Sequence, residues 1–288
     1  MKMAKSKIPY SQMLHTNISD SLMNALNHRC EQTGETLDHV VQEALAKSLG
    51  VELHTLFQVS TATALVEGVY KGCVTVGKIK TYGDFGLGTY DSLDGEGLML
   101  DGRVWQAHSD GSVTEPTDDS TAPFWVSVKF EADRSGTLES VSSWADLCAQ
   151  IDAYRNSANL FTAVRIDGLF DEIHYRVACK AEPGETLVQA TSHQSEFSLT
   201  QCQGTLMGFW SPTYSRTFNI PGYHLHLLSN DFKHGGHVLD IQAKNLKIQV
   251  MDADNVVMAL PETAQFLNAD LSQDPTAALS KAEGAQAK

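Results

Sequence analysis

Positive charge is scarce in this chain of 288 residues, which carries 21 lysine and arginine residues against 35 aspartate and glutamate residues. The formal net charge is −14 at neutral pH. Nucleic acids and anionic membranes favour a basic protein surface, so this balance argues against either as the main partner. A small anionic substrate is still compatible with the sequence, because one arginine in a pocket acts locally against the overall field.

Long apolar runs are also missing, although apolar residues make up 42% of the composition. No run approaches the roughly 18 apolar residues that a membrane-spanning helix needs. The residues from Met1 to Lys7 lack the apolar segment of a secretory signal. The five cysteines are widely scattered, with no disulfide-like spacing and no CxxC pair. We therefore expect reduced thiols in a cytoplasmic protein.

Residues 1–50 differ from the rest of the chain, since their five basic and five acidic residues leave them neutral. An extended stretch over residues 12–18 leads to Ser19, a residue type that commonly caps a helix N-terminus. Apolar residues then recur at helical spacing as far as Gly34, and again from Leu37 to Gly50. The pattern predicts a small module of one strand and two helices.

This order of strand, helix, glycine turn and helix weakly resembles a ribbon-helix-helix module. In that family two chains pair their strands, and the paired strands bind DNA. The candidate strand here, residues 12–17, contains no lysine or arginine. We therefore expect the module to serve dimerisation or packing rather than DNA binding.

From about residue 55 the sequence changes to short β-like runs separated by glycine and aspartate. Asp101-Gly102 and Asp110-Gly111 are typical hairpin turns. Residues 141–156 have the pattern of an amphipathic helix, and a last helical turn is expected around Leu279, after Pro275. The clearest candidate strands are residues 74–76, 97–100, 126–130, 163–166, 173–178, 222–228, 237–243 and 246–251. Strands, then a helix, then strands predict an α+β fold.

Three histidines near the C-terminal end have the spacing of a metal site. His224 and His226 are two residues apart on a predicted strand, so both side chains point to the same face. A turn ending in Gly235-Gly236 then brings His237 onto the next strand, where a hairpin can place it opposite His226. Three imidazoles with one open coordination position are typical of a catalytic zinc ion.

Two other interpretations of these histidines stay open at this point. Cupins also carry two histidines at this spacing on a strand, but they usually place a glutamate three or four residues later. This chain has Asn230 and Asp231 there, which weakens the comparison. His234 is an alternative ligand, and we rank it below His237 because its position in the turn leaves its direction unconstrained.

The motifs around the histidines resemble those of the acetolactate decarboxylase family. The resemblance covers roughly residues 55 to 285 and leaves the first fifty residues outside. It rests on several motifs in one order: GDFGLGTY at residues 83–90, LDGE at 93–96, the Asp101-Gly102 hairpin, APF at 122–124, VRIDG at 164–168, and GYHLHLLSNDFKHGGHVLD at 222–240.

The resemblance implies a fold, an activity and a partner. The fold would be two related sheet-plus-helix halves within residues 55–288, about 55–200 and 201–288, with mixed or antiparallel sheets and zinc bound on the second half. Members of the family convert 2-acetolactate to acetoin and carbon dioxide, in the route to acetoin and butanediol, and are generally homodimers.

The resemblance also assigns roles to individual residues. His224, His226 and His237 would hold Zn²⁺, which stabilises an enediolate as a Lewis acid. Arg176 would position the substrate carboxylate through its planar guanidinium. Glu96, and Glu283 on a C-terminal tail folded back into the site, would supply the carboxyl group that protonates the enediolate. Thr89 would contribute a hydroxyl near the substrate.

Two other functions remain as alternatives. One is a lyase of the same kind that acts on a different 2-hydroxy-3-oxo acid. The other is a ribbon-helix-helix DNA-binding regulator that uses a decarboxylase-like domain to sense a metabolite. The acidic composition counts against the regulator.

Overall fold

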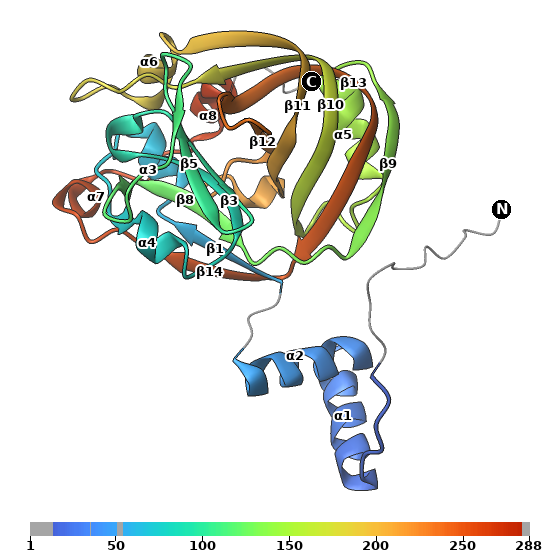
Figure 1. Cartoon of the computed structure of the whole chain (residues 1–288). Helices are drawn as coiled ribbons and strands as arrows, with labels where there is room; N and C mark the ends of the chain where they lie inside the picture. Colours follow the sequence, from blue (N-terminus) through green and yellow to red (C-terminus); the bar gives the residue numbers. More distant parts are fainter. Residues whose placement is uncertain (1–13, 35, 51–53, 284–288) are drawn as a thin grey trace.

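The computed structural model describes residues 14–34, 36–50 and 54–283. Two N-terminal helices, α1 (Asp20–Thr33) and α2 (Leu37–Leu49), lie outside a sheet-rich body that contains all the strands (Figure 1). Among the described residues, no helix has the length and apolarity needed to cross a membrane. The class is α+β, as the sequence predicts.

The limits of α1 and α2 confirm the sequence prediction. The Ser19 hydroxyl accepts a hydrogen bond from the backbone N–H of Leu22, and Thr36 caps α2 in the same way. Gly34 and Gly50 end the helices in the left-handed conformation, which glycine adopts without steric cost. Of the candidate strand, residues 12 and 13 lie outside the described residues, and residues 14–17 form no regular structure.

The first sheet of the body has seven strands in the order β14-β1-β8-β3-β4-β5-β6. Only the pair β1 and β14 is parallel; the other neighbours are antiparallel. The predicted Asp101-Gly102 hairpin joins β4 to β5, with both residues at positive φ. The strands are β1 (Thr55–Val59), β3 (Phe85–Thr89), β4 (Glu96–Leu100), β5 (Arg103–Ala107), β6 (Val113–Thr114), β8 (Phe124–Val128) and β14 (Asn255–Ala259).

The second sheet has the order β10-β11-β12-β13-β9, and all its pairings are antiparallel. β10 also pairs with β13, so four of the strands close into a ring with β9 outside it. The strands are β9 (Arg134–Val141), β10 (Phe161–Val177), β11 (Ser195–Ser211), β12 (Gly222–Ser229) and β13 (Gly235–Ala253).

Short elements cover the ends and faces of the two sheets (Figure 1). The β2–β7 pair and α4 lie beside the first sheet, α5 packs on β9 and β13, and α8 contacts α3 and α6. They are α3 (Ala62–Val66), β2 (Val74–Thr75), α4 (Val76–Ile79), η1 (Asp91–Leu93), β7 (Thr121–Ala122), α5 (Trp144–Asp152), α6 (Leu187–Thr191), η2 (Thr213–Ser215), α7 (Ala264–Asn268) and α8 (Thr276–Ala282).

Several predicted boundaries were wrong. Val76 begins α4 instead of ending a strand, because the Thr75 hydroxyl caps the N–H of Lys78. The two predicted strands on either side of Asn245 are one strand, β13, and those on either side of residues 167–172 are one strand, β10. The predicted helix at 141–156 is shorter, because Val141 ends β9 and Ser143 caps α5.

The sheets also divide the chain differently from the expected halves. The boundary expected near residue 200 falls inside β11. β14 returns from the C-terminal region to the edge of the first sheet. The second sheet is therefore built from one continuous segment, residues 134–253, whereas the first combines strands from residues 55–128 with β14.

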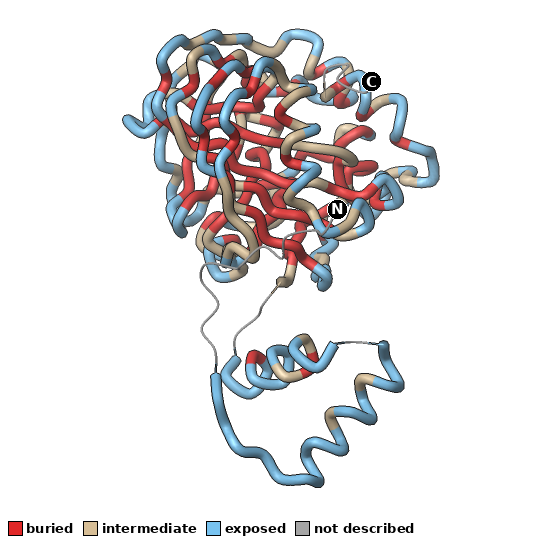
Figure 2. The backbone as a smooth tube through the Cα atoms, turned by 90° about the vertical axis from the view of Figure 1, so that its right-hand side faces the viewer, coloured by how far each residue is buried: buried red, intermediate tan, exposed pale blue. Residues whose placement is uncertain are grey.

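The two sheets share one apolar core. Phe85 on β3 and Phe209 on β11 meet edge to face, with ring centroids 6.2 Å apart. Figure 2 shows buried residues throughout the body, whereas α1 is almost wholly exposed. The body therefore holds a rigid scaffold on which the chemistry-bearing residues of both sheets meet.

Candidate metal centre

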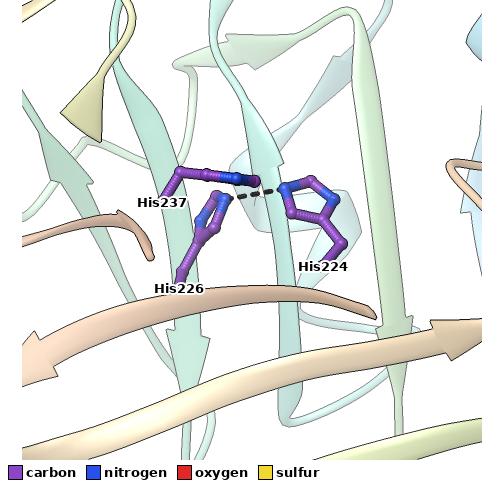
Figure 3. A group of neighbouring side chains, drawn as sticks. All are labelled: His224, His226 and His237. Carbon is purple, nitrogen blue, oxygen red and sulfur yellow. Dashed lines mark hydrogen bonds between the residues drawn. The ribbon is translucent and has the colours of Figure 1, made fainter. Parts of the chain in front are cut away.

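Three imidazoles converge between β12 and β13 (Figure 3). His224 and His226 point to the same face of β12, and the strand register places His237 of β13 opposite His226. The potential ligand nitrogens all lie within 4.8 Å of one another, and the Nε2 atoms of His224 and His226 are 3.0 Å apart. The predicted hairpin is therefore present, and it brings the three histidines into one cluster.

The start of β13 depends on glycine. Gly236 has φ 151°, and a Cβ atom there would overlap the carbonyl oxygen of Arg176 on β10. Glycine thus lets β13 lie close against β10, which sets the position of His237. His234 lies in the turn between β12 and β13, where its backbone N–H donates to the Ser229 hydroxyl. It is not part of the histidine cluster.

The environment keeps the three imidazoles neutral. Burial, followed by the Arg176 charge, lowers the pKa of His224 to about 3. Burial likewise holds the pKa values of His226 and His237 well below their ordinary range, and both side chains are nearly inaccessible. Neutral imidazole is the form that coordinates a metal ion, so burial prepares the cluster for a cation.

A backbone group fixes the orientation of His226. Its Nδ1 lies 3.1 Å from the carbonyl oxygen of Gly97 on β4, in the first sheet. A carbonyl oxygen only accepts, so Nδ1 carries the proton and Nε2 faces the other imidazoles with its lone pair. The first sheet therefore contributes an outer contact to a site whose imidazoles lie on the second.

Two carboxyl groups lie beside the imidazoles. Glu96 Oε2 is 3.7 Å from His226 Nε2, and Glu283 Oε2 is 3.6 Å from His237 Nε2. Glu96 begins β4, and its Oε1 accepts a hydrogen bond of 3.0 Å from the N–H of Ala178. Glu283 follows α8, so the C-terminal segment does return to the cluster.

The same burial raises the pKa of both carboxyl groups. For Glu96 the pKa rises to about 7, although the Arg176 charge and the Ala178 N–H oppose the shift. For Glu283 the pKa also rises through burial, opposed by Arg176. With its pKa near 7, the Glu96 carboxyl group can hold a proton near neutral pH and give it up.

Arg176 and Thr89 complete the cavity. The buried Arg176 guanidinium on β10 lies 3.4 Å from Glu283 Oε2. The Thr89 hydroxyl donates to the carbonyl oxygen of Gly95 at 2.8 Å, so towards any bound molecule it can only accept. The residues that line the cavity include Thr89, Glu96, Arg176, His224, His237 and Glu283.

Sequence reasoning missed three groups in this neighbourhood. They are the carbonyl oxygens of Gly97 and Ala282 and the side chain of Gln194, which contacts Arg176. Backbone carbonyl groups leave no trace in residue type. Gln194 lies between α6 and β11, where a glutamine is unremarkable, and only the strand pairing brings it to Arg176.

Comparison with known proteins identifies similar chains. The family model described as "Alpha-acetolactate decarboxylase" matches residues 56–273. The alpha-acetolactate decarboxylase of Methanosarcina mazei is 40% identical, over 79% of this chain and 80% of the relative. That of Methylococcus capsulatus is 37% identical, over 85% of this chain and 95% of the relative. The crystal structure of alpha-acetolactate decarboxylase from Bacillus subtilis strain 168 superposes with a TM-score of 0.77 at 34% identity, covering 80% of this chain and 99% of that one.

Proposed function

The chain belongs to the alpha-acetolactate decarboxylase family, and from this we propose that it converts 2-acetolactate to acetoin and carbon dioxide with the help of Zn²⁺. One observation carries the proposal: three neutral imidazoles, two of them buried, lie together with an arginine and two carboxyl groups of raised pKa. Each of these groups meets a separate requirement of the reaction.

The three imidazoles fit a divalent metal ion. His224, His226 and His237 would be its ligands, and three protein ligands leave a position for substrate, as in catalytic zinc sites. When bound, the ion supplies Lewis acidity, which stabilises the negative charge that decarboxylation leaves on the substrate's former ketone oxygen as an enediolate. The contact between His226 Nδ1 and Gly97 keeps the ligand nitrogen free of a proton.

Arg176 would bind the substrate carboxylate. Its guanidinium is buried beside the imidazoles and offers a planar array of donors that matches a carboxylate. With the carboxylate held by Arg176, the bond between the carboxylate carbon and C2 breaks. Carbon dioxide leaves, and the electron pair of that bond moves towards the neighbouring ketone.

Glu96 would return a proton to C2. Its Oε1 accepts the Ala178 N–H, so the proton resides on Oε2, the oxygen that faces the imidazoles. Transfer of that proton to C2 gives acetoin, and solvent restores it to the carboxyl group. Glu283 lies near Arg176 and His237 and would share the control of this proton.

The direct test is product formation by the purified protein. Racemic 2-acetolactate should release carbon dioxide and acetoin, activity should disappear on chelation, and added Zn²⁺ should restore it. Absence of turnover by fully metal-loaded protein would contradict the proposal. A panel of other 2-hydroxy-3-oxo acids would then be the next substrates to examine.

We further propose that residues 1–50 form a dimerisation module. No residue of α1 is buried, and α2 buries only Val40 and Ala46. Leu22, Leu45 and Leu49 are 50%, 43% and 73% exposed. Two helices with this much exposed apolar surface gain stability by packing against a second copy. The zero net charge of residues 1–50 allows close approach, whereas the remaining residues carry the whole of the −14.

We propose a cytoplasmic location for the protein. All five cysteines are free thiols, and free thiols are usual in a reducing compartment.

A further inference from the structure

Among the residues that the structure describes, the guanidinium of Arg176 has three side-chain or backbone partners in the cavity wall. Nη1 donates to Gln194 Oε1 at 2.7 Å and to the carbonyl oxygen of Ala282. Nη2 lies 3.4 Å from Glu283 Oε2. Two of the three partners are therefore neutral carbonyl oxygens, and the nearer of the side-chain partners is an amide.

Other arginines of this chain are held differently. Arg134 pairs with Asp252 at 2.6 Å, and Arg165 pairs with Asp167 at 2.9 Å. The side chains of Arg134 and Arg165 are 19% and 22% exposed, whereas that of Arg176 is only 7% exposed. A buried positive charge has the greatest need of a nearby negative charge. Yet the carboxylate beside Arg176 is more distant than those beside Arg134 and Arg165.

The orientation of the Gln194 amide is fixed from both sides. Guanidinium groups have no acceptor, so the amide oxygen must face Arg176. The amide nitrogen donates to Glu196 Oε1 at 3.1 Å, and Glu196 Oε2 lies 3.2 Å from His174 Nε2. Glu196 is paired with Arg176 across β10 and β11, so the strand register holds this row of side chains in place.

We propose that Gln194 is a specificity-determining positioning residue, which orients Arg176 through a neutral acceptor and leaves its positive charge available for a carboxylate ligand. The amide satisfies one N–H of the buried guanidinium without cancelling its charge. A carboxylate at the same place would form the hydrogen bond equally well, but it would compete with the carboxylate of an incoming ligand. The identity of the ligand as a 2-hydroxy-3-oxo acid rests on the proposed function; the preference for an anion does not.

The substitution Gln194→Glu separates the two roles, because glutamate has the same length and keeps an oxygen acceptor. We expect the KM for 2-acetolactate to rise about tenfold or more, equivalent to about 1.4 kcal/mol of binding free energy. Inhibition by acetoin, which is neutral, should change less than about twofold. Gln203→Glu is the matched control, since it adds the same charge to an exposed position of β11 and should leave KM unchanged.

A binding measurement makes the test independent of turnover. The probe is 2-hydroxy-2-methylpropanoate, an inert acid with the hydroxyl and carboxylate of the proposed substrate. Its Kd for metal-loaded protein, measured by calorimetry, should be about tenfold weaker in Gln194→Glu than in the wild type or Gln203→Glu. Equal affinity in all three proteins would overturn the inference, even with 2-acetolactate confirmed as substrate. If Gln194→Glu lost both inhibition by acetoin and affinity for 2-hydroxy-2-methylpropanoate, Gln194 would have a purely structural role. That result would also overturn the inference.

Discussion

The carbonyl oxygen of Gly97 lies 3.1 Å from Nδ1 of His226 and is the contact through which the first sheet orients a metal-site imidazole on the second. Gly97 is packed against the ring of the fully buried Trp125. A Cβ atom added to Gly97 would lie only 2.8 Å from the Cη2 atom of that ring. Position 97 thus has no room for a side chain, and the carbonyl has little freedom to move.

Gly97→Ala should therefore cost about 1–3 kcal/mol of stability, the range for overpacking a dense core. It should also weaken metal binding, because Trp125 can relax only by shifting β4 and the carbonyl. Thermal unfolding and metal content of the purified protein measure the two effects. Gly184→Ala, where a Cβ atom meets open space, should cost only the strain of its positive φ and leave the metal content unchanged.

His226→Ala should reduce bound zinc to a small fraction of the wild-type content and abolish decarboxylation. The reason is that the imidazole is buried, neutral and directed at the other two ligands. Elemental analysis and acetoin formation provide the measurements. The control is His234→Ala, since this turn histidine lies outside the cluster. Loss of metal in both variants alike would contradict the ligand set.

Glu96→Gln should lower kcat by about 10²–10⁴, the usual contribution of a general acid or base, with metal content retained. Glutamine keeps the hydrogen bond from Ala178 but has no proton to give to C2. Steady-state kinetics on metal-loaded protein provide the test. Glu172→Gln, on the exposed side of β10, is matched in charge and should behave as the wild type.

The stability should depend on pH through His54 and Asp133. His54 Nε2 lies 3.1 Å from Asp133 Oδ1, and this hydrogen bond raises the pKa of His54 in the folded state. A raised folded pKa gives stability that is complete below the unfolded pKa of about 6.5 and is lost as the pH rises through the folded value.

His54→Asn should therefore destabilise the protein more at pH 5.5 than at pH 9, by up to about 1 kcal/mol because the pair is partly exposed. Asparagine tolerates the left-handed φ of 52° at this position. Unfolding midpoints at the two pH values measure the difference. A pH-independent loss would assign the effect to packing.

If residues 1–50 dimerise as proposed, their deletion should weaken self-association of the protein, while decarboxylase activity per chain persists. The three histidines and the residues that line the cavity all lie between Leu65 and Glu283, so the proposed chemistry does not depend on α1 and α2. Analytical ultracentrifugation with activity assays would show this. An unchanged oligomeric state would contradict the dimerisation role. Sequence-specific binding of duplex DNA by the full chain would favour the alternative of a DNA-binding regulator.

Local sequence signals predicted the limits of α1 and α2 and the Asp101-Gly102 hairpin correctly. Ser19 and Gly34 mark the two ends of α1, because a cap acts within one helical turn. Asp101-Gly102 makes its hairpin because the turn needs positive φ at both residues. The three imidazoles were equally predictable, since alternation along β12 and a short turn decide their directions. All these features depend on neighbours in the sequence.

Long-range features could not be predicted in the same way. Asn245 adopts positive φ within β13, which looks like a break in the sequence but leaves the strand continuous. The pairing of β14 with β1 joins residues about two hundred positions apart, and no local pattern reveals it. Gln194 meets Arg176 only because β11 and α6 return beside β10.

The parallel pair of β1 and β14 has a consequence for how the protein forms during translation. Thr55 leaves the ribosome long before its partner Asn255, so β1 must wait with one edge unpaired while the intervening strands are made. Glu283 reaches Arg176 later still. A nascent chain can thus assemble most of both sheets while its cavity still lacks the Glu283 side chain, which joins the site only when synthesis is nearly complete.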